Sequence, residues 1–474
     1  MQQRLNPLTE EEVLKIHRAS VRILEKAGVG FPGGQALAIF REHGFKVDGE
    51  TVFITEEQLM TNVAKAPDAV PLVARNPAKN HLLGGGTPLL LGTGGAASVV
   101  EADGRMRLGL LSDHEKVQKL VQTSPVPQGA ANKAVFPSDV PTQTAHLDMF
   151  FQILTLTDNF TCIDTQDTVI VRDALEMLAM VFGGRDFLKK NTVGRATISV
   201  LSPLKYAPEQ VTALVMAAEN FQLSVITNMA MLGSTAPLNL AEYLALGNAE
   251  ILAGVVLSQL VRPGAPVVYG STSCPVEMKG LAAILGSPEA LQIARATVNL
   301  AHHYGLPSRT GGGLTDSQVP DGQALGESAL CLKQAIDCGA DYLLHAFGMM
   351  GGYLGMSLEK WVLDEELAAM ILASLRPLNM PEEINVSEII ELGHTGNYLM
   401  QPSTTKNFRS LHQFRVFNKL PHGMWDKKGA LDCVAAAGEA LKKRLADYEK
   451  PALDPKLEQE LAEYVKIRKR EILT

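Results

Sequence analysis

The spacing of apolar residues changes twice along this chain, and each change marks a predicted boundary. Residues 8–30 repeat apolar positions with the period of an α-helix, and Thr9 with Glu12 has the spacing of a capping box. Two further helices and a short hairpin are expected before the next change of pattern. We therefore predict a mainly helical N-terminal extension over residues 1–85.

Eight short apolar segments follow, recurring roughly every 27–43 residues with a helix-length stretch between most of them. They cover residues 88–91, 126–130, 160–163, 196–201, 223–228, 266–270, 306–310 and 341–345. Regular alternation of strands and helices predicts a parallel sheet. Eight units fit a closed barrel better than an open sheet, because (β/α)₈ barrels typically need about 250 residues. We predict an α/β fold in which residues 86–357 form a (β/α)₈ TIM barrel.

The pattern returns to helices after the last strand, which predicts a helical C-terminal extension over residues 358–474. The expected helices cover residues 358–375, 387–392, 427–449 and 455–472. Asp454 and Pro455 make a good start for the last one, as N-cap and first helical residue. Residues 393–399 interrupt this region, and they form either a plain turn or a segment that folds back to line a site or an interface.

Composition excludes several classes of protein. The chain has 474 residues, 46% of them hydrophobic, and a net charge of -8. No basic cluster is interleaved with aromatic residues, which disfavours nucleic-acid binding. No uncharged stretch of about 18 apolar residues is present, so no membrane span is expected. An apolar, helix-rich periphery favours a homo-oligomer.

The five cysteines show no C-x-x-C spacing, and the chain opens without the apolar core of a signal peptide. We therefore expect a cytoplasmic protein without disulfides. Cys274 follows a strand, where a nucleophile would lie, but no adjacent base is visible and an inert buried thiol is the favoured interpretation. The pair His302 and His303 is expected at the C-terminus of a helix, where it would interact with the helix dipole.

Catalytic residues of barrels lie at the carboxyl ends of the strands. Two glycine-rich loops follow the last two strands, at residues 311–313 and 348–355. Polar and aromatic candidates after the strands are Gln128, Asn132, Lys133, Phe136, Tyr206, Asn228, Tyr269, Arg309, Asp316, Gln318, His345, Phe347 and Tyr353. The sequence has no H-E-x-x-H, no paired histidine and acid at metal-ligand spacing and no G-x-S-x-G, so we expect no metal and no serine nucleophile.

Four segments carry a family resemblance: residues 268–280, residues 286–290, residues 308–323 and the glycine-rich run after Asp341. Together they resemble the trimethylamine methyltransferase (MttB-like) superfamily over nearly the whole chain. The resemblance implies a barrel that moves a methyl group from an amine to the Co(I) of a corrinoid (cobalamin) on a separate partner protein, with no cofactor bound permanently. The founding branch uses pyrrolysine, whereas this sequence contains only the standard twenty residues. It is similar to the non-pyrrolysine branch, which acts on quaternary amines such as glycine betaine and would release dimethylglycine.

The resemblance implies roles for the candidates. Aromatic rings would hold the trimethylammonium group by cation–π attraction: Phe136, Tyr206, Tyr269, Phe347 and Tyr353. Arg309 or Lys133 would bind a substrate carboxylate. The assisting polar groups would be Gln128, Asn132, Asn228 and Gln318. Asp316 and His345 are the predicted catalytic residues, orienting neighbours or offsetting the ammonium charge. The glycines expected to let the corrin ring approach are Gly311, Gly312, Gly313, Gly351 and Gly352.

Alternatives remain open at this stage. The same chemistry can act on proline betaine, carnitine or another methylated amine. A different class of enzyme is a barrel lyase that uses Lys133 or Lys205 as a Schiff base, which requires a desolvated lysine. A third class is a betaine-binding protein without catalytic activity.

Overall fold

The computed structural model describes residues 7–131, 133–378, 380–394 and 396–474. Helix α1 (Glu10–Lys26) begins at the predicted capping box, where Thr9 accepts the Glu12 N–H and Glu12 accepts the Thr9 N–H at 2.8 Å. The other elements of this region are α2 (Gly34–Glu42), α3 (Glu56–Val63), η1 (Pro77–Lys79), β1 (Val29–Gly30), β2 (Lys46–Asp48), β3 (Thr51–Phe53), β4 (Val70–Leu72) and β5 (His81–Leu83). Strand β1 pairs with β11 (Lys205–Tyr206), so the N-terminal region also extends the sheet.

The centre of the molecule is a parallel sheet, which confirms the predicted α/β class. Its strands, in spatial order, are β9 (Thr161–Ile163), β10 (Gly194–Leu201), β12 (Leu223–Asn228), β14 (Val267–Ser271), β16 (Ser308–Gly311), β17 (Tyr342–Leu344) and β6 (Leu89–Leu90). Each of these strands overlaps one of the predicted segments. The remaining predicted segment, residues 126–130, is bonded to β6 through Gly129 N–H and Leu90 O at 3.4 Å, and to Phe160 O through Ala130 N–H at 2.8 Å.

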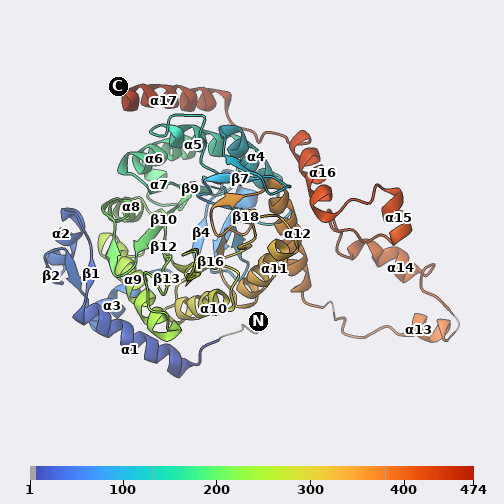
Figure 1. Ribbon diagram of the computed structural model, residues 1–474, viewed down its shortest axis with the longest axis horizontal. Helices are drawn as coiled ribbons and strands as arrows, with labels where there is room; N and C mark the ends of the chain where they lie inside the picture. Colours follow the sequence, from blue (N-terminus) through green and yellow to red (C-terminus); the bar gives the residue numbers. More distant parts are fainter. Residues whose placement is uncertain (1–6, 132, 379, 395) are drawn as a thin grey trace.

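The sheet is strongly curved. Strands β10 and β17 are separated by three other strands in the sheet, yet the Arg195 guanidinium lies 5.5 Å from the centre of the Tyr342 ring. Two strands this far apart in the order can face each other across such a distance only if the sheet bends back on itself. Figure 1 shows the consequence, with helices arranged in a ring around the strands.

The helices between the strands are α4 (Leu111–Gln122), α5 (Ala145–Leu156), α6 (Thr168–Phe182), α7 (Arg185–Leu188), α8 (Pro208–Glu219), α9 (Leu240–Val261), α10 (Pro288–His303) and α11 (Gly322–Asp337). Among the described residues, α9 alone has the length and apolar composition of a membrane span, and 94% of its apolar window is buried inside the protein. It packs against α1 and α3 on one side and the sheet on the other, as a core helix does. Helix α10 ends at His302 and His303, as predicted.

Additional short strands lie in the loops that follow the carboxyl ends of the parallel strands. A hairpin after β6 forms β7 (Ser98–Val100) and β8 (Met106–Leu108), and β7 pairs with β19 (Gly355–Met356), which pairs with β18 (Met349–Met350). On the opposite side, β13 (Met231–Leu232) pairs with β15 (Cys274–Pro275). These small sheets join loops from distant parts of the chain over one end of the parallel sheet.

The C-terminal region contains α12 (Leu358–Ser374), α13 (Ser387–Leu392), α14 (Pro402–Asn407), η2 (Phe408–Ser410), α15 (His422–Lys427), α16 (Cys433–Ala446) and α17 (Pro455–Leu473). The helix predicted from residue 427 starts later than expected. Ala430 has a positive φ of 47°, and the Asp432 side chain accepts the Ala435 N–H, so this turn ends one helix and caps the next. Helices α14 and α15 were not predicted.

A buried ion pair on α12 holds the two glycine-rich loops. Lys360 Nζ lies 2.6 Å from Asp364 Oδ2 and donates to Gly313 O at 3.0 Å and to Ser328 Oγ of α11 at 2.7 Å. The same Asp364 oxygen accepts the Gly348 N–H at 2.8 Å. Both side chains are 0% exposed. One pair of charges therefore ties together the loops after β16 and β17.

We expect Lys360→Met to lower the free energy of unfolding by about 3–5 kcal/mol, because it leaves a carboxylate buried without its cation. The double variant Lys360→Met/Asp364→Asn removes both charges, keeps an acceptor for Gly348, and should recover more than half of that loss. Denaturant unfolding above pH 7, where Asp364 of the wild type is ionised, measures both, because burial raises the pKa of Asp364 to about 6 while Lys360 opposes that rise. Lys333→Met, which breaks a partly exposed pair with Asp337, is the control and should cost about 1 kcal/mol or less. A double variant no more stable than the single one would contradict this account.

Candidate functional site

Arg309 of β16 lies buried inside the curved sheet. Its Nη1 donates to Thr227 Oγ1 at 2.8 Å and to Thr272 Oγ1 at 3.0 Å, while its Nε is buried without a hydrogen-bond partner. Among the described residues no carboxylate pairs with it, and burial lowers its pKa. Gly270 makes room for this side chain, because a Cβ there would lie 2.7 Å from Arg309 Cδ. A buried guanidinium whose hydrogen-bond partners are all neutral is poised for an anion.

A second buried arginine faces the same space. Arg195 of β10 is 4% exposed, and its Nη1 donates to Thr197 Oγ1 at 3.2 Å. Its Nε and the Tyr342 hydroxyl are both buried without a hydrogen-bond partner in the described part of the chain. The charge of Arg195 lies close enough to add to the effect of burial, which lowers the pKa of Arg309. Two cations, with polar atoms left unpaired, indicate a site completed by a ligand.

His345 and Tyr353 form one wall of this space. Their ring centroids lie 4.9 Å apart, and both residues have positive φ, 58° and 75°. The Gly94 N–H donates to His345 Nδ1 at 3.3 Å, so Nε2 carries the proton of the neutral ring. Burial, followed by the charges of Arg309 and Arg195, holds the pKa of His345 well below its usual value. The imidazole is therefore a neutral donor, not a cation.

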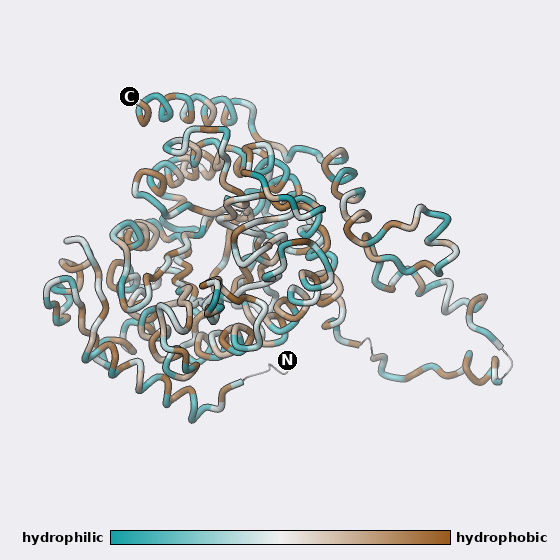
Figure 2. Tube along the Cα trace, viewed as in Figure 1, coloured by the Kyte–Doolittle hydropathy of each residue, from teal (hydrophilic) through white to brown (hydrophobic). Residues whose placement is uncertain are grey.

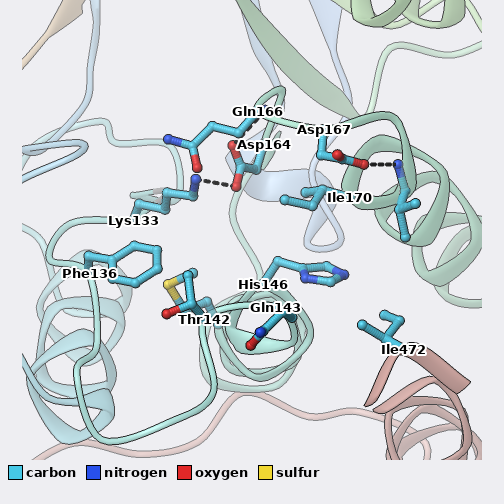
Figure 3. A pocket seen from close by; sticks show the side chains of 12 residues that line it. Lys133, Phe136, Thr142, Gln143, His146, Asp164, Gln166, Asp167, Ile170 and Ile472 are labelled. Carbon is cyan, nitrogen blue, oxygen red and sulfur yellow. Dashed lines mark hydrogen bonds and ion pairs between the residues drawn. The ribbon is translucent and has the colours of Figure 1, made fainter. Parts of the chain in front are cut away.

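Lys133 and Phe136 lie together at the edge of a cavity of about 560 Å³ (Figure 3). Lys133 Nζ pairs with Asp164 at 2.5 Å and lies 6.0 Å from the centre of the Phe136 ring. Lys133 is held in an ion pair with Asp164, whereas a Schiff-base lysine needs its amine free to attack a carbonyl. Lys205, the other candidate, is exposed on β11. Neither lysine thus has the surroundings that the lyase interpretation requires.

The glycine loops pack against each other instead of presenting a flat open face. A Cβ on Gly312 would lie 2.5 Å from Ala346 Cα, and one on Gly313 would lie 2.5 Å from Ala346 O. The Gly351 N–H donates to Ser317 O at 2.9 Å, and the Gly352 N–H donates to Thr315 O at 3.2 Å. Gly311 is likewise filled by the Leu314 side chain. These glycines allow close packing between loops, and corrin access remains a prediction about the loop surface they support.

Asp316 and Gln318 support these loops. Asp316 accepts the N–H groups of Leu285 and Gly286, each at 2.9 Å, and burial raises its pKa. Gln318 donates to Asp316 O at 3.2 Å and lies beside Gly351. Asp316 therefore holds the 285–286 turn, and its catalytic role stays a prediction.

Several predicted substrate ligands face the surrounding helices, which departs from the proposed aromatic cage. Tyr206 donates to Glu250 O and stacks on Phe31, and Tyr269 donates to Asn248 of α9. Asn228 donates to Glu250 Oε2 at 2.9 Å. On the other side of the molecule, Gln128 donates to Glu365 at 2.8 Å, and Phe347 packs 5.8 Å from the Trp361 ring. Asn132 lies outside the described residues. Of the predicted aromatic residues, only Phe136 and Tyr353 remain beside the candidate cavity or arginines.

Sequence reasoning missed Arg195, Tyr342 and Gly270. Arg195 lies at the start of its strand, whereas the predicted site residues lie at or after strand ends. An arginine within the apolar run 194–201 is unusual, and this signal could have identified it. Cys274 is buried with its pKa raised to about 12 by burial, as expected of an inert thiol. Within the described residues no group of three or more His, Cys, Asp or Glu side chains is arranged to hold a metal.

Comparison with known proteins identifies the family. A family model described as trimethylamine methyltransferase (MTTB) matches residues 1–473. The glycine betaine methyltransferase of Desulfitobacterium hafniense (strain Y51) is 35% identical over 98% of each chain. The proline betaine:corrinoid methyltransferase of Eubacterium limosum is 30% identical over 94% of each chain, and the L-carnitine:corrinoid methyltransferase of the same organism is 29% identical over 89% of this chain and 87% of its own.

Among solved structures, the monomethylamine methyltransferase of Methanosarcina barkeri aligns with a TM-score of 0.49 and 13% identity, over 95% of this chain and 90% of that one. The family assignment rests on the sequence matches alone, which run through the whole chain. The protein belongs to the trimethylamine methyltransferase (MTTB) family.

Proposed function

We propose that the parallel sheet closes into the predicted (β/α)₈ barrel, with residues 1–85 and 358–474 as extensions of a barrel at 86–357. The hydrogen bonds that join residues 127–130 to β6 and to Phe160 support this, because they bridge the two ends of the sheet. The contact between Arg195 and Tyr342 across the sheet supports it independently. In a closed barrel, both arginines point to the axis, where a substrate is shielded from water.

We infer that the protein moves a methyl group from a quaternary amine, with glycine betaine as the best candidate, to a corrinoid carried by a partner protein. The observation that carries this proposal is the pair of buried arginines without a carboxylate partner. Glycine betaine carries one carboxylate, which would neutralise part of that charge in bidentate hydrogen bonds. Relatives that share the family are named for glycine betaine, proline betaine and carnitine, and each of these molecules carries a carboxylate as well as a quaternary ammonium.

The chemistry needs little from acid–base groups. The leaving group is a neutral tertiary amine, so no proton has to move when the N–CH₃ bond breaks. Reduced cobalt of the partner's corrinoid supplies the nucleophile when it is bound. Arg309 and Arg195 would fix the carboxylate deep in the site, and Tyr353 with neutral His345 would border the substrate without adding charge. The protein then contributes orientation and exclusion of water.

The same electrostatics disfavour trimethylamine. Trimethylamine has no carboxylate, and its protonated form would enter a space that already holds two uncompensated cations. At a partly buried site, like charges a few ångströms apart cost several kcal/mol. A betaine, by contrast, brings an anion to the arginines and keeps its cation at the opposite end. Trimethylamine should therefore be a poor methyl donor for this protein.

We expect Arg309→Met and Arg195→Met each to lower kcat/KM for glycine betaine by about 10- to 150-fold, the value of one charge-assisted hydrogen bond, mainly through KM. Each should leave the free protein as stable or more stable, because an uncompensated buried charge is removed. Thermal unfolding with and without glycine betaine separates binding from folding: the ligand should raise the Tm of the wild type and not of the variants. Arg41→Met, at an exposed position of α2, is the control. Variants that keep wild-type KM and the ligand-induced shift would remove these arginines from the site.

The proposed reaction is tested by methyl transfer to chemically reduced cob(I)alamin, followed by the loss of Co(I) absorbance. Glycine betaine, proline betaine, carnitine and trimethylamine are compared at equal concentration. We expect the fastest turnover with glycine betaine, with dimethylglycine as product, and at least about tenfold less with trimethylamine. Turnover of another betaine would replace the substrate and keep the mechanism. Trimethylamine as the best donor would contradict the electrostatic argument, and no turnover with any donor would overturn the proposal.

A further inference from the structure

We propose that residues 377–431, which we call the arm, are a contact surface through which this chain associates with a second copy of itself. The arm leaves the body after α12 and returns to it at α16, and Figure 1 shows it projecting sideways from the ring of helices. Its second half also contacts the body, since the Arg415 N–H donates to Glu366 Oε1 of α12 at 3.0 Å and Val416 and Phe417 pack against the core there. The rest of the arm carries two features that a solitary chain does not explain.

The first feature is apolar exposure. Eight large apolar side chains of the arm are between 56% and 88% exposed: Leu378, Met380, Ile384, Ile389, Ile390, Leu399, Met400 and Leu411. Figure 2 shows these apolar stretches along the arm. Exposed apolar side chains gathered in one segment are typical of an interaction site. Helices α13, α14 and α15 have only six residues each, too few to be stable without a packing partner.

The second feature is the distribution of charge within the arm. Residues 377–401 contain four glutamates and no lysine or arginine, whereas residues 402–431 contain six lysines or arginines and one aspartate. One segment thus has an acidic apolar half followed by a basic half. In a two-fold dimer, the acidic half of one arm can lie against the basic half of the other, and the reciprocal contact forms at the same time. This self-complementarity favours a second copy of the chain as the occupant.

The position of the arm argues against the corrinoid protein as that occupant. The partner that accepts the methyl group must reach the substrate between the strands, within the ring of helices. The arm lies outside this ring, beyond α12 and α16 (Figure 1). Contact with a second copy leaves the open end of the sheet accessible, so both partners can bind together.

The test reverses charge in one half of the arm at a time. Replacing all four glutamates of the acidic half by lysine (Glu382→Lys/Glu383→Lys/Glu388→Lys/Glu391→Lys) makes both halves basic, and Lys406→Glu/Lys419→Glu/Lys427→Glu/Lys428→Glu makes both halves acidic. Sedimentation of the full chain at several concentrations should show a dimer or larger assembly for the wild type, and association weakened about 10-fold or more for either variant. Mixing the two variants should restore association, because each now complements the other. Ile389→Asp/Ile390→Asp should also weaken it.

Two exposed positions away from the arm serve as controls: Lys190→Glu for charge and Leu330→Asp for apolar surface. Neither should change association. A monomeric wild type at micromolar concentration would overturn the proposal, and so would reversal variants that associate normally. Variants that still self-associate and transfer methyl to free cob(I)alamin, but not to the corrinoid protein, would assign the arm to that partner instead.

Discussion

The ion pair between Lys360 and Asp364 is the interaction on which the carboxyl end of the sheet depends. Its two charges bond to the loop after β16 at Gly313 and to the loop after β17 at Gly348. Arg309 lies in β16, just before the first loop, and His345 begins the second, so the spacing of the loops sets the geometry of the candidate site. A buried pair that makes all these bonds is stable only as a unit, because either charge alone would be stranded in the core. Helix α12 therefore fixes the position of the two loops relative to each other.

The arginines in the site present the opposite situation, since their charges are not offset by the protein. Burying a guanidinium without a counter-ion costs free energy that a folded protein must recover elsewhere. The large apolar core around the sheet and α9 can absorb that cost. In the proposed function the substrate carboxylate supplies the missing anion, so binding would recover free energy that was lost when the arginines were buried. This arrangement links stability to function: residues that weaken the free protein are those expected to select a carboxylate-bearing substrate.

Much of the fold could be predicted from the sequence because it depends on local patterns. The parallel strands, the capping box at Thr9 and the end of α10 all follow from periodicity and cap chemistry. The directions of side chains could not be predicted, since these strands are apolar on both faces and show no alternation. Val268 joins the inner cluster of the sheet, so its neighbour Tyr269 must face the helices, although both look alike in sequence. For this reason the predicted aromatic cage included rings that face the helices, such as Tyr269. Arg195 was missed because it lies at the opposite end of its strand.

The charge pattern of the site explains why few acid–base residues are needed. A quaternary ammonium cannot be protonated or deprotonated, so a titrating group near it would only add a pH-dependent field. The structure holds His345 neutral by burial beside two permanent cations, and its Nδ1 is occupied by the Gly94 N–H. Lys133 is neutralised by Asp164 at the cavity edge. The net field across the site thus comes from Arg195 and Arg309, whose charges do not change over the physiological pH range. A field of fixed sign orients a zwitterion with its carboxylate inward and its methyl groups outward, which is the orientation that transfer to an external acceptor requires.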